Sequence, residues 1–109
     1  MSVVLNPVGF TVNDPVASAE NVTGVTILVG TVSGGPYTHS YPLTAAEIAA
    51  GLASGSFTGT LASIGETLPR GTYFAVATAT NAVGASGNSP EVTFQVETAP
   101  SAPVSLVLA

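Results

Sequence analysis

The sequence has almost no positive charge and lacks several of the residues that most often carry chemistry. It contains no cysteine, no tryptophan, one histidine and a single basic residue, Arg70, against six carboxylates. Without cysteine, neither a disulfide framework nor thiolate chemistry is available. The net charge of −5 and the isoelectric point near 4.1 leave nothing to neutralise phosphates or anionic lipids. We therefore predict no nucleic-acid partner and no membrane partner.

Long apolar runs are missing as well. No stretch approaches the ~20 consecutive apolar residues that a membrane-spanning helix needs. Residues 1–7 hold neither the basic region nor the long apolar region of a secretory signal peptide. If Met1 is the natural start, we expect synthesis in the cytosol without export by the general secretory route. The 109 residues suffice for one domain with a modest core.

The residues with catalytic potential are isolated from one another. His39 has no second histidine, no cysteine and no carboxylate close in sequence, so neither a catalytic triad nor a zinc site can be assembled. We expect it to be a solvent-facing strand residue. Glu66 and Glu91 can approach each other at one end of the fold, but a glycosidase pair needs a cleft between its carboxyl groups. We predict that the protein is not an enzyme and uses no cofactor and no small-molecule substrate.

A calcium site is the remaining possibility for a metal. Asp14 and Glu20, with Asn13 and Asn21, bracket a loop whose side chains and carbonyls are suited to Ca²⁺. Their spacing matches no calcium-binding motif. We therefore favour a solvated loop and predict no metal site.

Alternation of apolar and polar residues with period two dominates the chain, and Gly, Pro, Asn and Ser break it at short intervals. This pattern is typical of half-buried β-strands. It predicts strands over residues 8–12, 22–32, 37–43, 56–63, 73–81 and 90–98.

One short helix interrupts the predicted strands. Thr44 with Glu47 three residues later forms a capping box. Leu43 and Ile48 flank it as a hydrophobic staple, and Gly51 can end the helix. We predict one or two turns. The fold class is therefore all-β with one short helix.

One stretch indicates the architecture more closely. Leu68-Pro69-Arg70-Gly71-Thr72-Tyr73 leads into a strand that leaves through Asn81-Ala-Val-Gly84-Ala-Ser86. This resembles strand F of fibronectin type III domains, where a Leu-x-Pro-Gly-type corner precedes a tyrosine. Tyrosine corners of that kind belong to β-sandwiches. The run from Gly30 to Thr38, with Ser33-Gly34-Gly35-Pro36, is similar to the hairpin between strands C and C′ of the same family.

The resemblance covers about residues 22–98, although the tryptophan that such domains usually carry in strand B is absent. It implies a single fibronectin type III/immunoglobulin-like sandwich of about seven strands over residues 1–98. The short helix would lie between strands C′ and E.

Residues 99–109 differ in character from the rest. They form a Pro-rich linker followed by an apolar segment, and they look like the start of a following fibronectin repeat. The segment is either a frayed end or a strand that adds to a sheet edge, in cis or in trans. We favour the added strand.

The resemblance also predicts which side chains of two neighbouring strands face outward. Tyr73 and the alternate alanines after it point inward, as do Val25, Ile27 and Val29. Leu28, Phe74 and Val76 would then form an apolar patch on the outer face, unless the C-terminal segment or the helix covers it. The interface candidates are Leu28, Phe74, Val76, Val104, Leu106 and Leu108.

Two functions fit these features. The first is a structural subunit of a phage virion, a capsid cement or tail-associated protein that docks on the major capsid or tail protein or on copies of itself. Made in the host cytoplasm, it would reside on the virion surface; this reading rests on fold-level analogy. The alternative is an adhesion or carbohydrate-associated module from a larger bacterial extracellular protein. Tyr37 and Tyr41 would then be its best pair of sugar-binding aromatics.

Overall fold

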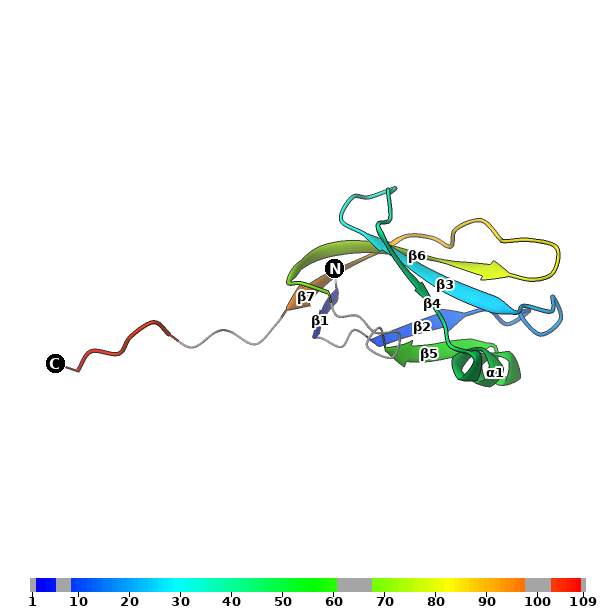
Figure 1. The fold of residues 1–109 in the computed structure, drawn as a ribbon, viewed down its shortest axis with the longest axis horizontal. Coiled ribbons are helices and arrows are strands. Elements are labelled where there is room, and N and C mark those ends of the chain that lie inside the picture. The colour runs from blue at the N-terminus through cyan, green and yellow to red at the C-terminus, as the bar shows by residue number, and fades with distance from the viewer. Residues whose placement is uncertain (1, 6–8, 61–67, 98–102, 109) are drawn as a thin grey trace.

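Strands make up most of the regular structure (Figure 1). The computed structural model describes residues 2–5, 9–60, 68–97 and 103–108. In chain order its elements are β1 (Ser2–Leu5), β2 (Gly9–Asn13), β3 (Gly24–Gly30), β4 (His39–Pro42), α1 (Ala45–Ser54), β5 (Ser56–Thr60), β6 (Gly71–Thr80) and β7 (Val92–Glu97). The predicted all-β class with one short helix is confirmed.

The strands form two sheets; in Figure 1, β6 and β3 of the larger sheet lie above β2, β5 and α1. Among the described residues, the larger sheet has the order β1-β7-β6-β3-β4, and the smaller pairs β2 with β5. Neighbouring strands are antiparallel except for β1, which runs parallel to β7. The sequence pattern did not predict β1, because a four-residue strand carries little periodicity and its partner lies at the other end of the chain.

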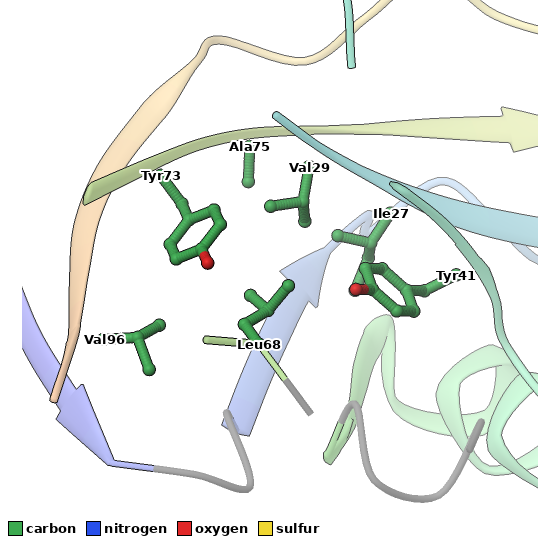
Figure 2. Close-up of a cluster of buried hydrophobic side chains, with 7 residues drawn as sticks. All are labelled: Ile27, Val29, Tyr41, Leu68, Tyr73, Ala75 and Val96. Carbon is green, nitrogen blue, oxygen red and sulfur yellow. The ribbon is translucent and has the colours of Figure 1, made fainter. Parts of the chain in front are cut away.

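Buried side chains fill the space between the sheets in two clusters. Figure 2 shows the first, which gathers residues of β3, β4, β6 and β7 and is packed by Phe10 and Val12 of β2. The inward side of β3 and β6 predicted from the sequence is confirmed at Ile27, Val29, Tyr73 and Ala75. The second cluster joins α1 and β5 to β3 and consists of Ala17, Val22, Val25, Ile48 and Phe57.

The helix α1 begins as predicted and ends later. Thr44 caps it, and the reciprocal bonds of the capping box with Glu47 are both present. The prediction that Gly51 ends the helix after one or two turns is wrong: α1 has 10 residues, and Gly51 is buried inside it. The left-handed terminal residue is Gly55, with φ 78°, whose N–H donates to the Gly51 carbonyl at 2.7 Å.

The corner before β6 is tied by a tyrosine hydroxyl. Tyr73 donates from Oη to the Pro69 carbonyl, four residues earlier, at 2.7 Å. Its ring stacks on Phe94 of β7 with the ring centroids 5.7 Å apart. Burial raises the pKa of the Tyr73 hydroxyl, which keeps it a hydrogen-bond donor.

Replacing Tyr73 by phenylalanine tests this corner. The ring and its stacking stay, while the bond to Pro69 is lost, so we expect the free energy of unfolding to fall by about 0.5–1.5 kcal/mol. Urea titration followed by circular dichroism measures the change. Thr72→Val, at the exposed neighbouring position, is the control and should stay near the wild-type value. A Tyr73→Phe variant as stable as the wild type would show that the bond contributes nothing.

Candidate docking site

The outer face of the larger sheet is partly covered by the chain itself. Leu28 and Phe74 are half-buried, and Val76 is only 5% exposed. The prediction that these three residues form an exposed apolar patch is therefore wrong for Val76. Leu28 and Val76 are direct partners in the β3–β6 ladder. The burial of Val76 therefore removes the centre of the expected patch.

The loop between β3 and β4, residues 31–38, folds back over this face. Gly30 pairs with Phe74 at the start of the loop. A Cβ at Gly30 would lie 2.6 Å from the Pro36 carbonyl oxygen and 3.0 Å from Tyr37 Cα. The backbone of Pro36 and Tyr37 therefore approaches Gly30 at a distance that only glycine allows. The helix, by contrast, packs against β5 of the smaller sheet.

Glu91 holds this loop in place from the residue before β7. Its carboxylate accepts hydrogen bonds from Ser33 Oγ at 2.7 Å, the Gly34 N–H at 2.7 Å and the Tyr37 hydroxyl at 2.5 Å. These bonds, that of Ser33 first, hold the pKa of the Glu91 carboxyl below its usual 4.5. The same contact raises the pKa of Tyr37. The sequence suggested only a pairing of Glu91 with Glu66, which lies outside the described residues.

The Glu91 cluster predicts a pH dependence of stability. A carboxyl whose pKa is lowered on folding stabilises the native state above its unfolded pKa, and this stabilisation is lost as the pH falls through the folded pKa. We expect the unfolding free energy of the wild type to drop as the pH falls below 4.5, and Glu91→Gln to flatten that drop. Urea titrations at a series of pH values measure it. Glu20→Gln, the same change in an exposed turn, is the control. Identical pH slopes for Glu91→Gln and the wild type would contradict the prediction.

An open apolar groove of about 540 Å³ lies between the two sheets, on the side where β2 faces β7. Phe10 and Val12 line it from β2, and Val92 and Phe94 from β7. Ile27, Val29 and Ala75 of the larger sheet line it as well, with Ser89 and Pro90 before β7. Among the described residues, β2 pairs with β5 alone. As far as the described residues go, the backbone groups of its other edge are therefore open to a further strand.

The end of the chain presents a second apolar feature. Val104, Leu106 and Leu108 are 104%, 83% and 84% exposed. The described residues 103–108, which we call the C-terminal segment, belong to neither sheet and run clear of both in Figure 1. These three interface candidates are thus exposed, whereas those on the sheet are half-buried or buried.

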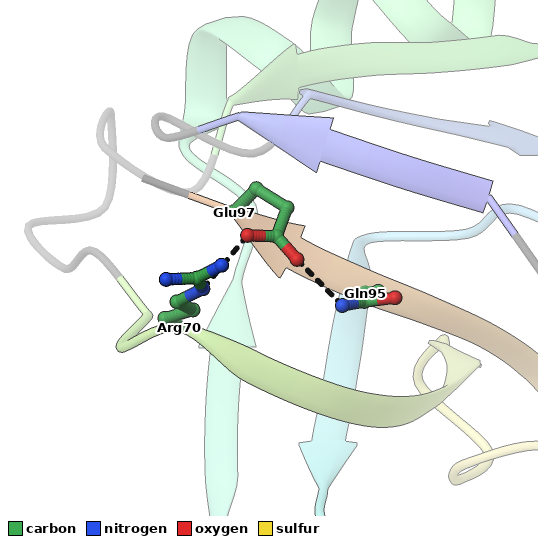
Figure 3. A network of polar contacts seen from close by, with 3 residues as sticks. All are labelled: Arg70, Gln95 and Glu97. Atoms are coloured by element: carbon green, nitrogen blue, oxygen red, sulfur yellow. Dashed lines mark hydrogen bonds and ion pairs between the residues drawn. The ribbon is translucent and has the colours of Figure 1, made fainter. Parts of the chain in front are cut away.

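A small polar network lies where β7 ends. Figure 3 shows Glu97 accepting a bond from Gln95 Nε2 at 2.5 Å and pairing with Arg70 Nε at 2.7 Å. The single basic residue of the sequence thus joins the start of β6 to the last residue of β7. Because two thirds of the Arg70 side chain is exposed, the pair contributes no more than about 1 kcal/mol.

Within the described residues, the remaining candidates are not brought together into a site. His39 is half-buried and stacks on Tyr41, with centroids 6.1 Å apart, so the prediction of a solvent-facing histidine is wrong. Tyr41 is 1% exposed and Tyr37 is bound to Glu91, so they do not form a displayed aromatic pair. Nowhere in the described part of the chain do three or more His, Cys, Asp or Glu residues gather in a way that could hold a metal ion.

None of the described helices is long and apolar enough to cross a membrane. Comparisons with protein-family models, with curated proteins and with solved structures gave no match.

Proposed function

We propose that this chain is a fibronectin type III/immunoglobulin-like β-sandwich that acts as a non-enzymatic docking subunit of a phage virion. The strand order supports the fold assignment. The run β7-β6-β3-β4 and the pair β2-β5 correspond to strands G-F-C-C′ and B-E of such domains. The bond of Tyr73 to Pro69 supports it as well, because it has the geometry of a tyrosine corner.

One observation carries the docking role: the exposed apolar C-terminal segment. Val104, Leu106, Val107 and Leu108 are all more than four-fifths exposed. Contiguous exposed apolar surface on a monomer often marks an interaction site. The segment has no charged side chain, so burying it against a partner desolvates no charge.

The partner in this proposal is the major capsid or tail protein of the particle or another copy of the chain, and the protein resides on the virion surface. At about 25 cal/mol per Å² of apolar area, a few hundred Å² per copy gives useful adhesion when many copies bind one lattice. A net charge of −5 keeps the free subunit soluble. The carbohydrate-binding alternative loses support because Tyr41 is buried and Tyr37 is tied to Glu91.

Co-sedimentation tests this function. Particles of the phage whose genome carries the chain are stripped of the subunit and mixed with the full chain or with a chain lacking residues 103–109. We expect saturable binding of the full chain and loss of binding on truncation, while Ser105→Ala binds normally. Particles of an unrelated phage serve as the control. If the full chain stays in the supernatant when it is mixed with particles of its own phage, the virion role is refuted.

A further inference from the structure

We propose that the C-terminal segment of one copy docks as an added β-strand in the groove between β2 and β7 of a second copy. This inference rests on the docking role proposed above for the segment, and it identifies the partner. The two features that it joins, an open groove and an exposed apolar segment, are both present in every copy.

The groove has the properties of an acceptor site for a strand. Its inner wall is apolar, and β2 contributes all five of its residues to the lining. In the described part of the chain, the edge of β2 away from β5 has no strand beside it. An added strand would satisfy these backbone groups and cover Phe10 and Val12.

The C-terminal segment matches this site in length and pattern. Val104–Leu108 has as many residues as β2, and five residues of extended chain span about 17 Å. In a strand, Val104, Leu106 and Leu108 share one face, and Ser105 and Val107 share the other. The first face suits the apolar floor of the groove, and the second would lie beside the exposed Thr11.

The sequence of the segment is competent to form a strand in this fold. Ser105-Leu-Val-Leu108 differs from Ser2-Val-Val-Leu5 at one position, and the latter forms β1. β1 begins opposite Phe94 and continues to Glu97, whereas β7 lines the groove with Val92–Phe94. The groove is therefore next to the site of β1 and distinct from it.

Neither surface carries charge. No residue that lines the groove is charged, and residues 103–108 contain no charged side chain. Docking therefore leaves no ion unpaired in the interface. Both surfaces are mainly apolar, which is the complementarity that a strand inserted between two sheets requires.

The arrangement favours a second copy over the chain's own segment. The chain leaves β7 at Glu97, on the part of β7 that β1 borders and away from the Val92 end. To enter its own groove, the segment would have to reverse its direction after Glu97, because β7 lines the groove with Val92–Phe94. A segment from another copy approaches without that constraint. Each copy is then donor and acceptor at once, a head-to-tail contact that builds rings or open chains.

Single cysteines test this contact directly, because the chain has none of its own. Thr11→Cys places a thiol on β2, and Ser105→Cys or Val107→Cys places one on the segment face that would lie beside it. Paired residues on one face of a sheet have Cβ atoms about 4.5–5.5 Å apart, within reach of a disulfide after small adjustment. Mixing the acceptor variant with either donor variant under mild oxidation should give a mixed disulfide dimer, identified by mass. Val83→Cys, at a 96% exposed loop position outside the groove, is the control acceptor.

A matched pair of substitutions tests the strand face. Leu106 and Val107 are 83% and 85% exposed, so neither change threatens the fold. Leu106→Asp, added to the Ser105→Cys donor, should reduce cross-linking to Thr11→Cys by about tenfold or more, because it directs a charge into the groove. Val107→Asp in the same donor should stay within about twofold of the parent, because it faces away from the groove.

Three results would overturn the inference. One is absence of a mixed dimer from both donors. Another is equal cross-linking of Thr11→Cys and Val83→Cys. The third is a cross-link formed only inside a chain that carries both Thr11→Cys and Ser105→Cys, which would place the segment in its own groove. Failure of the virion role can be distinguished from failure of this inference. If copies cross-link but do not sediment with particles, this inference stands and the virion role fails. If the chain binds particles but does not cross-link, only the docking role stands.

Discussion

Replacing Phe57 by alanine is expected to lower the free energy of unfolding by about 3–5 kcal/mol, the range for large aromatic deletions in a packed core. Phe57 is fully buried on β5 and packs in the cluster with Val22, Val25 and Ile48. It is also the ladder partner of Val12 on β2. The substitution therefore opens a cavity beneath α1 and loosens the strand that forms one wall of the groove.

Small domains are stable by about 5–15 kcal/mol in total, so this substitution removes a large fraction of the stability of the domain. Urea titration at 15 °C with circular dichroism measures the loss. Thr58→Ala, at the exposed next position of β5, is the matched control and should stay within about 0.5 kcal/mol of the wild type. A Phe57→Ala variant within 1 kcal/mol of the wild type would mean that this cluster does not hold the smaller sheet.

Local signals in the sequence predicted much of the fold. The alternation of β3 and β6 is visible in the sequence because each strand buries one face, and the ladder between them follows the predicted side. The capping box of Thr44 and Glu47 spans three residues, and the hydroxyl bond of Tyr73 spans four. Interactions of such short range leave a signature in the order of residues.

The outer face of the larger sheet could not be predicted in this way. The alternation of side chains along β6 correctly places Val76 on the outer face, but it does not show what packs over that face. The loop over this face is held by Glu91, which reaches Ser33, 58 residues earlier in the chain. The groove is likewise a property of how two sheets align, and only the apolar character of Val104–Leu108 was visible in the sequence.

Gly51 is the second position where a large effect is expected, and here helix propensity and the observed packing predict opposite signs. At an ordinary position inside a helix, replacing glycine by alanine stabilises by about 1 kcal/mol. In α1, however, a Cβ at Gly51 would lie 1.9 Å from Phe57 Cδ1 and 2.3 Å from Cε1. We therefore expect Gly51→Ala to destabilise the protein by about 1–3 kcal/mol, the cost of overpacking a core.

The reason is the close approach of α1 to β5. The Phe57 ring cannot move away, because it is fully buried against Ala17 and Ile48. The helix must therefore shift outward or the ring must leave its rotamer. The lack of a side chain at Gly51 thus allows α1 to pack closely on β5. The residue with the left-handed conformation that ends the helix is Gly55.

A double-mutant cycle separates this clash from helix propensity. Phe57→Leu removes the ring and leaves a smaller side chain, so Gly51→Ala in that background should cost less than in the wild type or become stabilising, with a coupling of about 1–3 kcal/mol between the two sites. Urea titration of the four proteins measures it. If Gly51→Ala stabilises the wild type by the ordinary propensity difference, α1 does not lie against Phe57 as described. If Gly51→Ala destabilises the wild type but not the Phe57→Leu protein, glycine is needed at position 51 because a Cβ there would clash with the Phe57 ring.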